Sequence, residues 1–247
     1  MTERLWRKLA DAFVCISLHE RRERRAKTQR EFDRVGLKCQ YYLATKHPTN
    51  TNKGIFDSHQ RAIQLALEST PNAQRIMIME DDLAFAETAI VKRVLWELIA
   101  FVNDSDITWD HIRLGGLPTW FYQGVPGYEH VYKINFSLCS HAYIITSEFA
   151  RAVLRKSYIS GLPFDNAINF WSPFRQYICD PMVVYQRDDP SDNVNAILAC
   201  VFTPLRDAIT HRRCMEFNRA IFKTYKCTVV VVIVALMVTL WVRIKAH

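Results

Sequence analysis

The sequence predicts an α/β domain with a mixed, mostly parallel sheet and flanking helices, followed by one C-terminal transmembrane helix. Apolar runs of strand length alternate with helical patterns between residues 13 and 156, which is typical of βαβ units. The 247 residues, 49% of them hydrophobic and 23% charged, suffice for one sizeable core. An uncharged segment near the C-terminus, residues 227–242, is too long for a strand.

The first elements are two short strands around a charged helix. Phe13–Leu18 is a continuous apolar run, as expected for a strand buried on both faces. Arg21–Val35 has the composition of a solvent-facing helix, which ends at Gly36. Cys39–Ala44 is expected to form the second strand.

A helix and a strand follow a polar loop around residues 48–53. Asp57 or Ser58 is expected to cap the helix, whose apolar residues 62, 63, 66 and 67 recur at helical spacing. Pro71 and Asn72 end it, and Arg75–Met79 (RIMIM) is the next buried strand.

The remaining predicted elements complete the alternation. Ala89–Val102 is an amphipathic helix, and Asp110–Leu114 is a strand that leads into two glycines. Ala142–Ile145 is a further strand, followed by a helix over Ser147–Lys156. Ligands of such sheets bind beyond the carboxyl ends of the strands, so functional residues are expected there.

The acidic motif Glu80-Asp81-Asp82 directly follows RIMIM and is the strongest candidate site. Carboxylates in a row repel one another, and a hard divalent cation would relieve the repulsion. Mn²⁺ or Mg²⁺ prefers oxygen ligands and commonly combines one or two carboxylates with substrate phosphates. We therefore expect Glu80 and Asp82 to hold a metal and Asp81 to contact the bound substrate. The alternative is a solvated acidic turn.

Five other positions are candidates for binding or catalysis. Arg21 and Arg24 open a helix after the first strand, where they could meet a diphosphate, although a solvated helix face would have the same composition. Ser58 and His59 are candidate substrate contacts, and a single histidine is more often structural. Asp165, after a Gly-Leu-Pro turn, is a candidate general base.

The cysteines and the charge narrow the class of protein. The seven cysteines form no CxxC pair, which favours reduced thiols in a reducing compartment over a zinc site. The net charge of +7 is not laid out as one basic stripe, and no aromatic-plus-basic platform accompanies it, so nucleic-acid binding is not expected.

The C-terminal part of the sequence predicts a membrane anchor. Residues 1–210 are expected to form the folded domain, 211–226 a basic juxtamembrane segment and 227–244 a transmembrane helix with flanking Lys and Arg. A buried terminal strand or helix is the alternative. Because no signal peptide is recognised and the span ends close to the C-terminus, we expect a single-pass protein inserted after synthesis, with its domain in the cytosol.

A series of motifs in order resembles glycosyltransferase family 25, which includes lipooligosaccharide and procollagen galactosyltransferases. The resemblance covers residues 13–186. Its motifs are Ile16-Ser17-Leu18 with Arg21 and Arg24, Gly54 with Ser58-His59, Met79-Glu80-Asp81-Asp82, Leu114-Gly115-Gly116, His141-Ala142-Tyr143-Ile144-Ile145, Pro163-Phe164-Asp165 and Tyr185-Gln186.

The resemblance implies an A-type glycosyltransferase fold and a metal-dependent transfer with inversion. The donor would be a nucleotide sugar, most often UDP-galactose, and the acceptor a hydroxyl group of a glycan or protein. The metal would bridge the donor diphosphate to the acidic motif, and Asp165 would take the proton of the acceptor hydroxyl. Two other classes stay open: an inactive membrane-anchored binding module that keeps the fold, and a metal-dependent nucleotidyltransferase.

Overall fold

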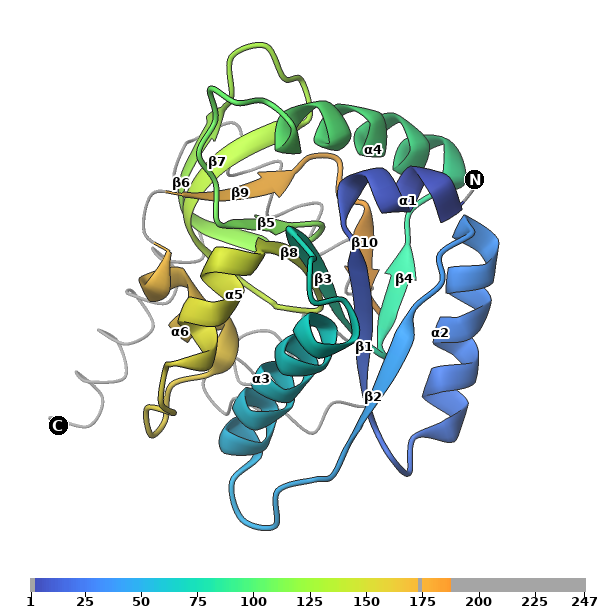
Figure 1. Ribbon diagram of the computed structural model, residues 1–247, viewed down its shortest axis with the longest axis vertical. Helices are drawn as coiled ribbons and strands as arrows, with labels where there is room; N and C mark the ends of the chain where they lie inside the picture. The colour runs from blue at the N-terminus through green and yellow to red at the C-terminus, as the bar shows by residue number, and fades with distance from the viewer. Residues whose placement is uncertain (1–2, 173–174, 188–247) are drawn as a thin grey trace, which may run out of the picture.

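A computed structural model describes residues 3–172 and 175–187, with backbone only for residues 117–122. Within this part of the chain, eight strands form one sheet and two short strands form a second (Figure 1). The large sheet contains β1 (Ala12–Leu18), β2 (Gln40–Ala44), β3 (Arg75–Glu80), β5 (His111–Arg113), β6 (Leu117–Gly124), β7 (Val131–Leu138), β8 (Ala142–Thr146) and β9 (Gln176–Cys179). The small sheet pairs β4 (Leu83–Phe85) with β10 (Val184–Gln186).

The large sheet is mixed but mostly parallel, as the sequence predicts. Its order is β2-β1-β3-β8-β5-β9-β7-β6. The pairs β1–β2, β1–β3 and β5–β9 are parallel, whereas β8 is antiparallel to both neighbours and so is β7. Consequently six strands run in one direction and only β7 and β8 run in the other. The carboxyl ends of β1, β2 and β3 therefore lie at one edge, beside the start of β8.

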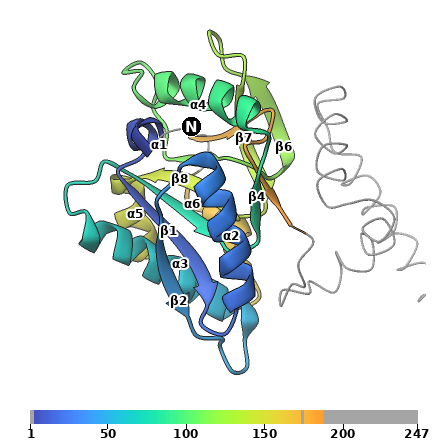
Figure 2. The ribbon, with the colours of Figure 1, turned by 90° about the vertical axis from the view of Figure 1, so that its right-hand side faces the viewer.

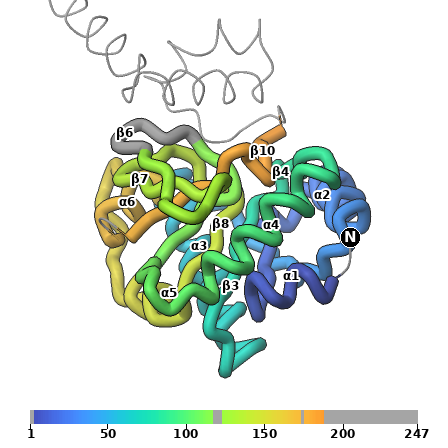
Figure 3. The backbone as a smooth tube through the Cα atoms, turned by 90° about the horizontal axis from the view of Figure 1, so that it is seen from above, coloured from blue at the N-terminus to red at the C-terminus, as the bar shows by residue number. Residues whose placement is uncertain are grey.

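Helices cover both faces of this sheet. They are α1 (Glu3–Leu9), α2 (Arg22–Val35), α3 (Thr51–Ser69), α4 (Thr88–Val102), α5 (Ser147–Leu154) and α6 (Phe164–Trp171). Seen from above, α1, α2 and α4 gather on one side and α5 and α6 on the other (Figure 3). Each side has its own core of buried apolar residues, with α3 contributing to that of α5 and α6.

Successive side chains of a central strand point alternately into the two cores. Phe13 and Cys15 of β1 join the core under α1, α2 and α4, whereas Val14 and Ile16 join the core under α3, α5 and α6. All four side chains are buried, which explains the unbroken apolar run in the sequence. The turned view in Figure 2 shows α2 and α3 on opposite sides of these strands.

The predicted start of α3 is wrong. The helix begins at Thr51, and the side chain of Asn50 caps it by accepting a hydrogen bond of 2.9 Å from the backbone N–H of Lys53. Asp57 and Ser58 lie inside the helix, where Asp57 pairs with Lys53 at 2.5 Å. Polar residues in the first turns hid the helix because they interrupt its apolar stripe.

The sequence pattern does not predict several helices and strands, most of which are short. These are α1, β4, α6, β9, β10 and the long β6–β7 hairpin. The buried residues of β7 recur as Val131, Ile134 and Ser137, which is not the two-residue period of a regular strand. Three-residue strands such as β4 and β10 are too short to show any period.

No helix among the described residues is long and apolar enough to cross a membrane. The predicted juxtamembrane segment 211–226 and span 227–244 lie outside the described residues.

Candidate functional site

The acidic motif lies where the sequence places it, at the carboxyl edge of the parallel strands. Glu80 is the last residue of β3, and its register partner Ile16 is near the end of β1. Asp81 and Asp82 occupy the turn between β3 and β4. The motif is thus enclosed between the large sheet and the small sheet formed by β4 and β10.

Both carboxylate oxygens of Asp81 are held by other side chains. Ser17 donates a hydrogen bond of 2.6 Å to Oδ2, and an Arg24 nitrogen lies 2.8 Å from Oδ1. The Asp81 side chain is only 5% exposed, and burial raises its pKa against the opposing effects of Ser17 and Arg24. The carbonyl of the same residue accepts bonds of 2.6 Å from Thr28 Oγ1 and from Arg187. Asp81 is therefore fixed by four neighbours.

Asp82 has one satisfied oxygen and one that has no partner. Its Oδ2 lies 2.9 Å from Arg24 and accepts a bond of 2.9 Å from Gln186. Its Oδ1 is buried and has no hydrogen-bond partner among the residues that the structure describes. Burial, together with the charges of Glu80 and Asp81, raises the pKa of Asp82 to about 6 despite Arg24 and Gln186. At neutral pH this leaves a buried, mostly ionised carboxylate with one oxygen available.

Glu80 faces the other side of the site and is more exposed. Ser140 donates a bond of 3.1 Å to Oε1, and His59 Nε2 lies 3.5 Å from the same atom. The side chain keeps 30% of its surface exposed. Burial tends to raise the pKa of Glu80, but the hydrogen bond and charge of His59, followed by His141 and Ser140, outweigh it and lower that pKa. Glu80 is consequently ionised.

The side chain of His59 is buried against residues of the core under α3, α5 and α6. Its ring stacks on Phe164 of α6 with centroids 4.0 Å apart, and Nδ1 lies 2.9 Å from the hydroxyl of Tyr143. The adjacent Ser58 donates its hydroxyl to the Gly54 carbonyl at 2.6 Å. A role for Ser58 in donor binding remains a prediction, whereas His59 does reach the acidic motif.

The two predicted arginines have different environments. Arg24 pairs with both aspartates, so a protein cation already offsets the repulsion from which the sequence predicted a metal. Arg21 precedes α2, and its positive charge lowers the pKa of Asp81. Both lie at the motif, and contact with a diphosphate remains a prediction for each.

Asp165 lies in the first turn of α6, close to the loop that carries Ser140. Its Oδ2 accepts a bond of 3.0 Å from the backbone N–H of Cys139, and Oδ1 accepts one of 3.0 Å from Asn166. A carboxylate offers about four lone-pair positions, so these bonds anchor the group without using all of its acceptor capacity. The structure thus connects Asp165 through Cys139 and Ser140 to Glu80.

Several residues of the site were not predicted as site residues. Ser17 and Thr28 hold Asp81, Ser140 holds Glu80, and Arg187 binds the carbonyls of Asp81 and Leu83. The sequence offered two clues to Ser17: it lies in the Ile16-Ser17-Leu18 motif of the family resemblance, and β1 ends at the same edge of the sheet as β3. Arg187 lies more than a hundred residues from the motif, and no local pattern signals its role.

The residues fit a divalent cation that relies on substrate for part of its coordination. No group of three His, Cys, Asp or Glu side chains within the described ranges could hold a metal alone. Glu80 and the partnerless Oδ1 of Asp82 supply two carboxylates, and Mg²⁺-type sites commonly use one or two together with phosphate oxygens and water. Asp81 is occupied by Ser17 and Arg24.

The glycine pair after β5 serves the packing of the site. A Cβ atom on Gly115 would lie 1.9 Å from the Val184 carbonyl oxygen, and one on Gly116 would lie 2.8 Å from Ser137 Oγ. Glycine therefore lets β10 and the end of β7 approach the backbone closely. This approach brings Gln186 and Arg187 onto the acidic motif.

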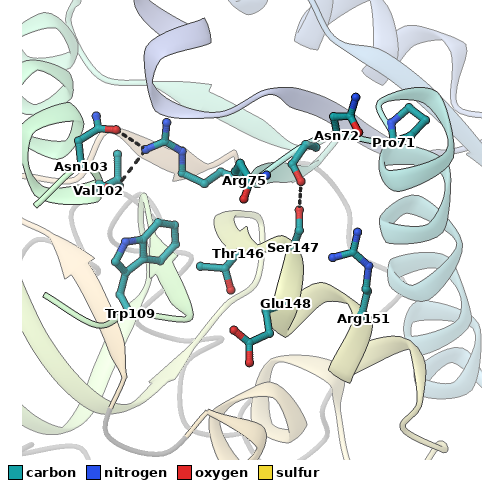
Figure 4. A pocket seen from close by; sticks show the side chains of 12 residues that line it. Pro71, Asn72, Arg75, Val102, Asn103, Trp109, Thr146, Ser147, Glu148 and Arg151 are labelled. Carbon is teal, nitrogen blue, oxygen red and sulfur yellow. Dashed lines mark hydrogen bonds between the residues drawn. The ribbon is translucent and has the colours of Figure 1, made fainter. Parts of the chain in front are cut away.

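A cavity of about 660 Å³ lies at the opposite edge of the sheet (Figure 4). Arg75, the first residue of β3, lies among Trp109, Glu148 and Arg151 there and bonds to Val102 and Asn103. Because Glu80 is the last residue of the same strand, this cavity is separate from the acidic motif.

Comparison of the sequence with known protein families found no match, and comparison with curated proteins found none. Solved structures with a related arrangement were found. A197 from STIV is 14% identical, with a TM-score of 0.47 over 72% of this chain and 85% of that one. A glycosyltransferase involved in the glycosylation of the major capsid of PBCV-1 is 12% identical, with a TM-score of 0.34 over 57% of this chain and 63% of its own.

UDP-glucose pyrophosphorylase complexed with UDP-glucose is 10% identical, with a TM-score of 0.39 over 75% of this chain and 78% of the other. Similarities at this level assign neither a function nor any site residue.

Proposed function

We propose that this chain is a metal-dependent glycosyltransferase that uses a nucleotide-sugar donor. The observation that carries the proposal is the partnerless, buried Oδ1 of Asp82 beside the ionised Glu80. An ionised carboxylate with an unpaired buried oxygen is costly, and a divalent cation bound to a diphosphate would satisfy it. The site lies beyond the carboxyl ends of β1 and β3, where α/β sheets bind nucleotides.

Both carboxylates and arginines of the site would contribute to binding the donor. Glu80 and Asp82 would hold Mn²⁺ or Mg²⁺, which when bound neutralises negative charge on the leaving diphosphate. Arg21 lies beside the motif, and Arg24 keeps the aspartates in place from 2.8 and 2.9 Å. His59 and Ser140 orient Glu80 through its Oε1 atom. Asp81 accepts from Ser17, pairs with Arg24 and maintains the shape of the turn, and we keep it as a candidate contact of the donor.

Transfer to an acceptor requires a base, for which we propose Asp165. Its carboxylate is oriented by the N–H groups of Cys139 and Asn166, next to the loop that contacts Glu80. There it would accept the proton of a glycan or protein hydroxyl as the sugar is transferred with inversion, galactose from UDP being our first candidate. The predicted anchor over 227–244 would keep the site near a membrane, and we propose a cytosolic orientation.

A turnover screen tests this proposal. The purified full-length chain is incubated with a panel of nucleotide sugars and Mn²⁺, and release of the nucleoside diphosphate and transfer to oligosaccharide acceptors are measured. We expect one donor to be turned over by the wild type and not by Asp82→Asn. A control arm supplies nucleoside triphosphates with sugar 1-phosphates. Pyrophosphate release in that arm alone would show a nucleotidyltransferase, and binding without turnover in every arm would show an inactive binding module.

A further inference from the structure

The residue Arg113 is the least expected charge in the structure. It is the last residue of β5, its side chain is completely buried, and its hydrogen bonds go to carbonyl and amide oxygens. Burial lowers the pKa of Arg113 to about 10, partly offset by Asp165, so the guanidinium remains charged at neutral pH. Burying a charge whose hydrogen-bond acceptors are neutral is expensive, and an apolar side chain would serve packing better.

The guanidinium of Arg113 joins two separate segments around the proposed base. One terminal nitrogen donates to the carbonyl of Cys139, in the loop between β7 and β8. The other donates at 3.1 Å to the carbonyl of Asp165 and at 3.1 Å to Asn169 Oδ1, both on α6. Asn169 in turn donates to the carbonyls of Ser137 and Asp165. The guanidinium therefore links the loop to the first turn of α6.

The loop held by this fork has an unfavourable backbone conformation. Cys139 has φ of +71°, in the left-handed region that a non-glycine residue adopts only at a cost of about 1–2 kcal/mol. Its carbonyl accepts from Arg113, and its N–H donates to Asp165 Oδ2 at 3.0 Å. A strained residue persists where its surroundings over-determine it, and these two bonds supply that constraint. Without the guanidinium of Arg113 the loop would relax, and Asp165 would lose the hydrogen bond from the backbone N–H of Cys139.

We infer that Arg113 is a positioning residue, which fixes the Asp165 carboxylate and the Cys139–Ser140 loop in one geometry. This inference rests on the proposed role of Asp165 as base and goes beyond it. A base must stay within hydrogen-bond reach of the proton that it takes, and a shift of about 1 Å can cost roughly a hundredfold in rate. Because Arg113 is completely buried, it would act on the rate through Asp165.

The chain contains a matched control for this role. Arg75 begins β3, and its guanidinium also binds two carbonyls and an asparagine: Lys8 and Val102 through their carbonyls and Asn103 through Oδ1. These bonds lie at the opposite edge of the sheet, beside the cavity of Figure 4. Replacing either arginine by lysine keeps the charge and loses the planar fork. Any effect common to both variants is therefore general to the fold.

The test compares Arg113→Lys with Arg75→Lys in the full-length chain. We expect Arg113→Lys to lower kcat at least tenfold with the donor KM within threefold, and Arg75→Lys to leave both within twofold. A second readout needs no turnover: the rate at which iodoacetamide alkylates Cys139, followed by mass spectrometry of its peptide. Release of the loop should raise this rate at least fivefold in Arg113→Lys and not in Arg75→Lys.

Three results would overturn the inference: a kcat within twofold of the wild type in Arg113→Lys, an unchanged alkylation rate in that variant, or equal losses in both variants. Complete absence of donor turnover by the wild type would instead overturn the proposed function. In that case the alkylation comparison alone decides whether Arg113 holds the loop. Should Arg113→Lys not fold, Asn169→Ala opens the same junction from the α6 side and must show the same increase in alkylation.

Discussion

Removing the guanidinium of Arg24 should destabilise the ligand-free protein severely. Arg24 lies 2.8 Å from Asp81 and 2.9 Å from Asp82, and the three side chains are 12%, 5% and 8% exposed. Breaking a buried ion pair by removing one partner typically costs about 3–5 kcal/mol, because the other charge stays buried and uncompensated. Here two carboxylates lose their cation together. We expect Arg24→Met to lower the free energy of unfolding by that amount.

A double-mutant cycle isolates the interaction. Asp82→Asn should by itself change stability little or increase it, since Oδ1 has no partner and Glu80 and Asp81 repel the charge. In the Asp82→Asn background, Arg24→Met should therefore cost less by about 1–3 kcal/mol. Urea unfolding followed by tryptophan fluorescence in EDTA measures all four proteins. A loss below about 1 kcal/mol for Arg24→Met, or purely additive losses, would refute the idea that Arg24 is the cation that compensates Asp81 and Asp82.

Two further stability predictions concern the elements that build the site. Asn50→Ala removes the side-chain cap of α3 and should lower the free energy of unfolding in urea by about 1 kcal/mol. Ser58→Ala, inside the same helix, should lower it by less than half of that amount. Equal losses would contradict the observed start of α3. Gly115→Ala places a methyl group 1.9 Å from the Val184 carbonyl oxygen. It should lower the free energy of unfolding by about 1–3 kcal/mol and weaken the contact of β10 with the acidic motif. Gly127→Ala is the control: its methyl group would meet no atom within 4 Å, but its φ of +83° should cost about 1 kcal/mol from backbone strain alone. A larger loss of stability in Gly127→Ala than in Gly115→Ala would show that close approach is not the reason for the glycine pair.

The sequence predicts β1, β3, β5 and β8 well because these central strands are buried on both faces. β1, β2, β3, β5 and β8 were all predicted within one or two residues, and the end of α2 at Gly36 is confirmed by its left-handed φ of 65°. Continuous apolar runs and a helix-terminating glycine are local signals. The direction of β8 is not local, because nothing within Ala142–Thr146 records that its neighbours run the other way.

The candidate site was predicted in part for the same reason. The acidic motif follows an obvious strand, so its place at the sheet edge could be predicted. The contacts of Arg24 with the aspartates could not, since they depend on how α2 packs beside β3. Arg113 carries no sequence signal of its role, because its partners Cys139, Asp165 and Asn169 come together only in the folded chain.

The central claim, that the acidic motif binds a metal together with a diphosphate, is tested most directly by titration calorimetry of UDP with and without Mn²⁺. The account predicts that Mn²⁺ tightens UDP binding at least tenfold in the wild-type chain and has no such effect in Asp82→Asn. Asp106→Asn, which removes an exposed carboxylate, is the control and should behave as the wild type does. Equal UDP affinity in EDTA and in Mn²⁺, or full Mn²⁺ dependence in Asp82→Asn, would contradict the account.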